Sequence, residues 1–119
     1  MEAHQQAFKH VKDLLSARTQ QEPIDACKAW MDEHCLYLAL DARKAVWAAI
    51  SHAEVRSHAL DEASDQSLEP AQRRQFHDTA VNEWSAIMAA LSTIVSSVEL
   101  PPLGEDELNI IRRAAAVTE

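Results

Sequence analysis

The residues of this chain that suit metal or acid–base chemistry are histidines and glutamates at helical spacing. Glu54 and His58 are four residues apart, so they share one face of a helix. His77 and Glu83 lie on or beside the apolar stripe of the next expected helix. Facing helices build metal sites from such groups, but the Glu-x-x-His pair of di-iron bundles is missing. The first interpretation is a set of salt bridges that fixes the hairpin end, such as Arg73 with Asp61 or Glu54, and a metal- or cofactor-binding sensor or enzyme that uses these four residues is the alternative.

A second cluster combines thiol, thioether and imidazole groups along one expected helix. Cys27, Met31, His34 and Cys35 span ~80° of a helical wheel, and such ligands suit Cu(I) or Zn. Cysteine and methionine are also favoured in protein interiors, so we expect this face to pack in the core. Along one helix the two thiols would stand ~12 Å apart, beyond the ~7 Å within which a disulfide can form. We therefore expect two reduced thiols.

No catalytic motif is complete in this sequence. Its one glycine excludes a glycine-rich phosphate loop, and none of its serines stands in a nucleophile-elbow pattern. We therefore expect neither an enzyme nor a bound cofactor.

The net charge of −8 restricts the classes of partner. The 19 acidic residues against 11 basic ones repel a phosphate backbone, which disfavours direct binding to nucleic acid. Only the pairs Arg73-Arg74 and Arg112-Arg113, brought to one face, would reverse that expectation. No stretch approaches the ~18 apolar residues that cross a bilayer, and the N-terminal residues lack the basic and apolar regions of a secretory signal. These features predict a cytoplasmic protein with no direct contact to nucleic acid or membrane.

The elements that position these residues follow from the scarcity of glycine. With one glycine in 119 residues, the chain must be mostly right-handed helix, joined by turns that avoid positive φ. We predict an all-α fold in which residues 1–119 form a single domain, an antiparallel (up-down) bundle of four helices with a fifth, C-terminal helix packed on it. Periodicity and cap residues place the helices at 3–18, from Pro23 toward Asp41, at 42–63, at 70–97 and from Gly104 onward.

The boundaries of the two central helices depend on single residues. Asp41 is the expected N-cap of the helix at 42–63, although one kinked helix through this point remains open. Ser67 or Glu69, followed by Pro70, is expected to begin the helix at 70–97. That helix carries an apolar stripe close to a heptad seam, long enough to pair two copies of the chain. The stripe comprises Phe76, Ala80, Trp84, Ile87, Leu91, Ile94 and Val98.

Two groups of residues are candidates for contact with a partner. The first is a second apolar side beyond the core stripe, made of Leu36, Tyr37 and Leu40, with Trp47 at the edge of the next helix. The second is the acidic connection between the third and fourth helices, which could meet a basic surface. Its candidates are Asp61, Glu62, Asp65 and Glu69. The sequence therefore predicts an acidic helical module, homodimeric, that binds or inhibits another protein.

Overall fold

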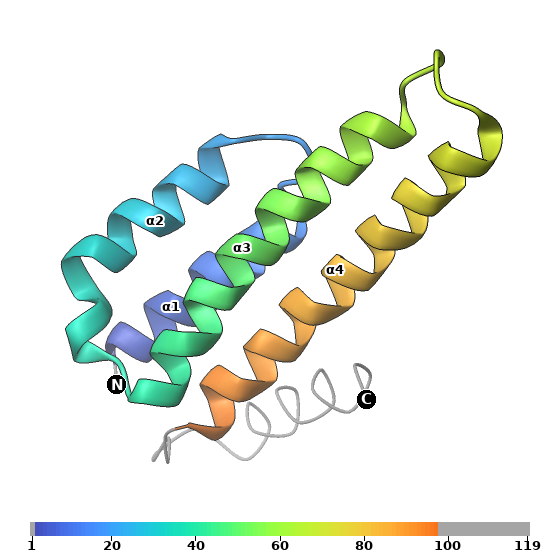
Figure 1. The fold of residues 1–119 in the computed structure, drawn as a ribbon. Coiled ribbons are helices and arrows are strands. Elements are labelled where there is room, and N and C mark those ends of the chain that lie inside the picture. The colour runs from blue at the N-terminus through green and yellow to red at the C-terminus, as the bar shows by residue number, and fades with distance from the viewer. Residues whose placement is uncertain (1, 98–119) are drawn as a thin grey trace.

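Residues 2–97 are described by a computed structural model, and all regular structure in this range is helical (Figure 1). Four α-helices follow one another: α1 (Glu2–Leu15), α2 (Glu22–His34), α3 (Leu40–Ala63) and α4 (Pro70–Ser96). A single 3₁₀ turn, η1 (Cys35–Tyr37), lies between α2 and α3. The predicted all-α class is confirmed. The predicted fifth helix, from Gly104, lies outside the described residues.

The start of α4 agrees with the sequence prediction. Glu69 is its N-cap in an extended conformation, and Pro70 follows within the first turn, where a missing N–H is no loss. The Gln72 side chain completes a capping box, because its Oε1 accepts the Glu69 backbone N–H at 3.2 Å. The predicted ends of α3, at residue 63, and of α4, within one residue of Ser96, are also confirmed.

The break between α2 and α3 differs from the prediction. The helix α2 already ends at His34, and α3 begins at Leu40 with Ala39 as its N-cap, so Asp41 lies inside the first helical turn and is not the cap. Leu38 and Ala39 are extended (ψ 144° and 149°). This geometry buries Leu38 to 4% exposure and lets the Ala39 N–H donate to His4 Nε2 at 2.9 Å. Tertiary contacts therefore end the helix early.

The connection after α1 also departs from expectation. The helix ends at Leu15, three residues short of the predicted end, and Arg18 has a positive φ of 51°. The expectation that the turns avoid positive φ is therefore wrong at this residue. A left-handed conformation costs a residue with a Cβ roughly 1–2 kcal/mol. The turn is closed by the Gln20 N–H, which donates to the Ala17 carbonyl at 2.8 Å, and Ala17 itself is buried.

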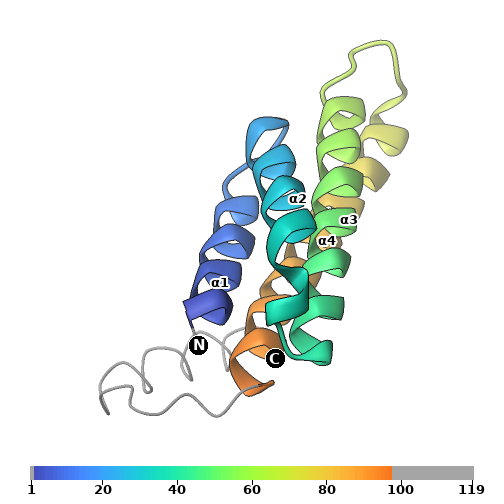
Figure 2. The same cartoon turned by 90° about the vertical axis from the view of Figure 1, so that its left-hand side faces the viewer.

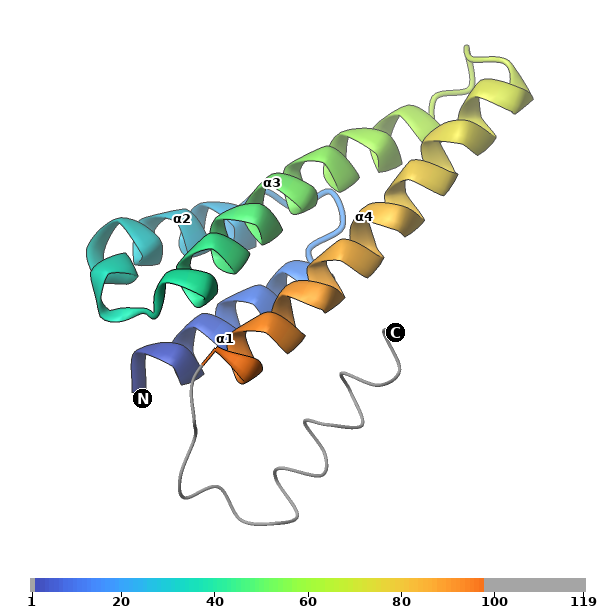
Figure 3. The same ribbon diagram turned by 60° about the horizontal axis from the view of Figure 1, so that its bottom comes forward.

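The helices pack around a pair formed by α3 and α4, which lie side by side and share the most extensive contact (Figures 1 and 2). Helix α1 packs against both of them, and α2 packs against α1 and α3. The end of the α3–α4 pair that carries its connecting loop extends beyond the connection between α1 and α2 (Figures 1 and 3). Over this end, α3 and α4 have mainly each other to cover their apolar side chains.

The buried core includes only part of the apolar stripe that was predicted for α4. It is built from all four helices, and Ala80, Ile87, Leu91 and Ile94 of the α4 stripe belong to its buried residues. Trp84, predicted to point inward with them, is instead 41% exposed. It lines a pocket beside Arg18 of the connection between α1 and α2. Val98, the last stripe position, lies outside the described residues. The largest fully buried side chains are Leu14, Ile24, Met31, Ile87, Ile94, Val11, Val46 and Cys27.

Within residues 2–97, no helix combines the length and apolar character needed to cross a lipid bilayer.

Candidate functional site

Three large apolar side chains are exposed where α2 turns into α3. Leu36 is 80% exposed, Tyr37 71% and Leu40 56%. Trp47, 38% exposed, lies two helical turns beyond Leu40 on α3, about 10 Å along the same side of the helix. We call these four residues the apolar patch. The exposure of Trp47 agrees with its expected place at the edge of its helix. Leu36, Tyr37 and Leu40 were expected on the second helix, but the first two lie in η1 and Leu40 begins α3.

The turn that carries the apolar patch is held in place from several directions. The Arg43 side chain donates from Nε to the Cys35 carbonyl at 3.1 Å and from Nη2 to the Leu38 carbonyl at 3.3 Å. On the other side, the His4 imidazole of α1 accepts the Ala39 N–H. Leu38 anchors the turn in the core. The exposed side chains therefore stand on a braced backbone.

A row of aromatic rings leads from α1 to the apolar patch. The Trp30 ring lies 5.3 Å from His10 and stacks on His34, with centroids 5.0 Å apart and planes 11° apart. The His34 ring in turn lies 6.3 Å from Tyr37. The Trp30 indole N–H donates to Gln6 Oε1 at 3.0 Å, which satisfies its polar atom. Tyr37 is thus the exposed end of a packed row.

The acidic residues lie at the projecting end of the α3–α4 pair. Asp61, Asp65 and Glu69 are exposed, and Glu62 is partly buried. The Asp65 carboxylate accepts hydrogen bonds from the Ser67 hydroxyl at 2.7 Å and the Ser67 N–H at 2.9 Å. These two bonds, the hydroxyl first, hold the pKa of Asp65 below its usual value. The carboxylates at this end, which we call the acidic tip, form no ion pair within 4 Å in residues 2–97.

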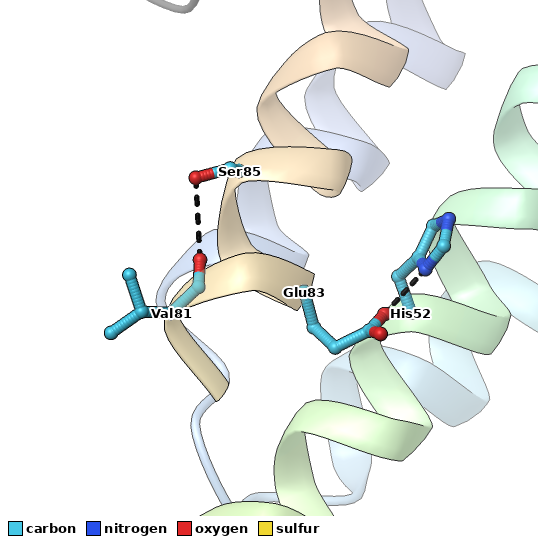
Figure 4. Close-up of polar contacts among 4 residues, drawn as sticks. All are labelled: His52, Val81, Glu83 and Ser85. Carbon is cyan, nitrogen blue, oxygen red and sulfur yellow. Dashed lines mark hydrogen bonds and ion pairs between the residues drawn. The ribbon is translucent and has the colours of Figure 1, made fainter. Parts of the chain in front are cut away.

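The four residues of the alternative metal site are not brought together. Glu54 forms an ion pair with Lys28 of α2 at 3.2 Å, and His58 packs edge-on against Phe76, with centroids 6.4 Å apart. Glu83 instead accepts a hydrogen bond from His52 Nδ1 across the α3–α4 pair (Figure 4). His77 is exposed. Within the part of the chain that the structure describes, no three histidine, cysteine or acidic side chains are grouped as metal ligands would be.

Two residues of the cysteine cluster lie in the core, as expected, and the other two are only partly buried. Cys27 and Met31 are fully buried, while Cys35 lies in η1 and not in the same helix as Cys27, which corrects the expected continuous helix. His34 Nδ1 lies 3.0 Å from the Trp30 carbonyl and is occupied by that contact. Burial raises the pKa of the Cys27 thiol to about 12, and both cysteines are free. Cys27 is therefore a packing residue with a protonated thiol.

Sequence reasoning missed two concave features. One is a shallow groove of about 470 Å³ between α3 and α4, lined largely by Ala45, Ala48, Ala86 and Ala89. The other, which we call the arginine pocket, has a volume of about 230 Å³ and lies where the α1–α2 connection meets the α3–α4 pair. The arginine pocket is lined by Arg18, Arg56, Leu60, His77, Ala80, Val81 and Trp84. These residues come from three separate segments, so no local spacing could have revealed the pocket.

Comparison with known proteins finds no family model, no curated protein and no solved structure that matches this chain.

Proposed function

We propose that this protein is a non-catalytic interaction module that binds, and thereby can inhibit, another protein. The observation that carries the proposal is the apolar patch on its braced turn. Burying a large apolar side chain contributes about 1.5–3 kcal/mol, and Leu36, Tyr37 and Leu40 forgo most of that gain in the free chain. Arg43 and His4 hold the backbone beneath them, so a partner would meet the patch at little cost in ordering.

The acidic tip supports a partner with a basic surface. Its carboxylates are not neutralised by ion pairs within residues 2–97, and the chain carries a net charge of −8. Such a field accelerates the encounter with a positively charged protein and weakens as salt is added. The apolar patch then supplies affinity and the acidic tip supplies steering.

The proposal includes a homodimer and the complete antiparallel bundle expected from the sequence. The alanine-lined groove between α3 and α4 supports the dimer, because small side chains allow another helix to approach closely. Two free cysteines, one of them deeply buried, are in keeping with a reducing compartment such as the cytoplasm.

Site-specific photocrosslinking in the producing cells tests the interaction. A photoreactive phenylalanine analogue at Tyr37 should give one discrete adduct with a second protein, because Tyr37 is 71% exposed at the centre of the patch. The same analogue at Val55, 46% exposed on α3 and outside the patch, is the matched control. The substitution Leu36→Glu should abolish the Tyr37 adduct while the fold persists. Equal crosslinking from both positions, or none from Tyr37, would contradict the proposal.

A further inference from the structure

The arginine pocket combines two cationic groups with an apolar wall. Arg56 is fixed at one side because its Nη1 donates to the Leu15 carbonyl at 3.0 Å, which ties α3 to the end of α1. Arg18 enters from the α1–α2 connection and lines the same pocket. No carboxylate within residues 2–97 lies within 4 Å of either guanidinium. Although the chain has 19 acidic residues, neither arginine forms an ion pair within residues 2–97.

The positive charge of Arg18 acts on the Arg56 guanidinium. Burial, and then the like charge of Arg18, lower the pKa of Arg56. An anion between them would relieve this repulsion, and the planar fork of arginine matches the two oxygens of a carboxylate.

The backbone at Arg18 is held in an unfavourable conformation. Its φ of 51° makes it the one positive-φ residue among residues 2–97. Strain of this kind costs roughly 1–3 kcal/mol and clusters at binding sites. Here the residue with the left-handed conformation is itself one of the residues that line the pocket.

The opposite wall is largely apolar and partly open, with His77 as the polar side chain that α4 contributes. Val81 is 50% exposed and Trp84 is 41% exposed, one helical turn apart on α4. Leu60 and Ala80 line the pocket beside them. An indole face of this kind accepts a flat aromatic ring or a branched alkyl group. A ligand that satisfies both walls needs a negative head and an apolar body.

We propose that the arginine pocket binds a small organic carboxylate whose body is one aromatic ring or a short branched chain. The volume of about 230 Å³ sets the size, since it equals seven or eight waters at ~30 Å³ each. The carboxylate lies between Arg18 and Arg56, and the apolar body packs on Trp84 and Val81. A hydrated inorganic phosphate would satisfy the arginines but would leave the apolar wall uncovered.

Nuclear magnetic resonance on the full chain tests the site with phenylacetate as the probe. The Trp84 indole N–H signal, assigned by its loss in Trp84→Phe, should shift progressively as phenylacetate is added. Phenylacetamide has the same shape without the charge, and inorganic phosphate has charge without the ring, so both should cause much smaller shifts. Removing one of two charge-assisted contacts in Arg18→Gln should weaken phenylacetate binding by ~10-fold or more.

Control variants separate binding from folding. Arg18 is exposed, so Arg18→Gln should keep the helical circular dichroism of the parent even if Arg56→Gln does not. Arg74→Gln removes an exposed arginine outside the pocket and should leave the phenylacetate titration unchanged. No Trp84 shift with phenylacetate, an equal shift with phenylacetamide, or unchanged binding in Arg18→Gln would each overturn the proposal. Equal binding of phosphate would overturn the role of the apolar wall.

Discussion

At the scale of single residues, His4 couples protonation to folding. Its side chain is 7% exposed, and Nε2 accepts the Ala39 N–H, which requires the neutral ring. Burial, followed by the positive N-terminus, lowers its pKa below 6.5. The unfolded chain therefore binds this proton at a higher pH than the folded chain does. The contribution of His4 to stability is complete above pH 6.5 and is lost as the pH falls toward the lowered pKa.

Urea unfolding at pH 7.5 and pH 5.5 measures this effect. We expect His4→Gln, which keeps an acceptor but does not titrate, to lose less free energy of unfolding over this interval than the parent. His58→Gln, at an exposed histidine, should retain the parent's pH dependence. An identical pH dependence in His4→Gln and the parent would refute the coupling.

The two cysteines should differ in reactivity for a reason that is also local. Burial raises the pKa of Cys27 to about 12, so almost no thiolate exists there at pH 8, whereas Cys35 is only partly buried. We expect a disulfide reagent to modify Cys35 in the native protein and Cys27 only after unfolding, as followed by mass spectrometry. Cys35→Ser should remove the fast reaction. Two thiols reacting together without denaturant would show that the core around Cys27 opens readily.

At the scale of elements, predictability from the sequence depends on whether a boundary is set locally. Glu69, Pro70 and Gln72 cap α4 among themselves, and its start was predicted correctly. The end of α2 is set by Leu38 in the core and by His4, which lies 35 residues away from Ala39 in sequence. The residues close to Asp41 in sequence do not include His4 and do not show that Leu38 will be buried, so the end of α2 could not be predicted from them.

The same distinction applies to the candidate sites. The exposure of Leu36 and Tyr37 follows from a second apolar side on one short stretch, which the sequence displays. The spacing of Trp84 is that of a core residue, but the structure leaves it 41% exposed, and nothing in its local sequence indicates this. The arginine pocket needs the left-handed turn at Arg18, a conformation that residue type disfavours and spacing cannot predict.

Helix α4 has a buried face and an exposed face, and the two should contribute differently to the free energy of unfolding. Ile87 is fully buried against the core, so Ile87→Ala should lower the free energy of unfolding by ~2–5 kcal/mol, through lost burial and the cavity left behind. Val81 lies on the same helix but is 50% exposed, and Val81→Ala should change it by less than ~1 kcal/mol. Chemical denaturation of both variants provides the comparison. Similar losses at the two positions would mean that α4 is not packed as described.

At the scale of the whole molecule, the proposed self-association can be compared with the overall dimensions. The radius of gyration is 15.5 Å, against about 13 Å for a compact chain of this length. The principal extents are 52, 30 and 19 Å, so the described part of the chain is elongated along the α3–α4 pair. An elongated arrangement exposes more of each helix than a compact bundle does, and the alanine-lined groove lies on the exposed surface of the α3–α4 pair.

A dimer that forms across that groove should be disrupted by a large charged side chain introduced into the groove. Ala48 and Ala89 line the groove from opposite helices, and both are exposed. We expect light scattering to give twice 13.3 kDa for the parent and the single-chain mass for Ala48→Glu or Ala89→Glu, because the larger side chain would fill the groove and keep the second copy from approaching closely. Ala29→Glu, at an exposed alanine of α2 outside the groove, should stay dimeric. A parent that is monomeric at every concentration would refute the dimer. A dimer that survives both groove variants would mean that its interface lies outside the groove.

Because the apolar patch and the groove involve different residues, loss of the dimer should leave the Tyr37 crosslink intact, and this outcome separates self-association from partner binding.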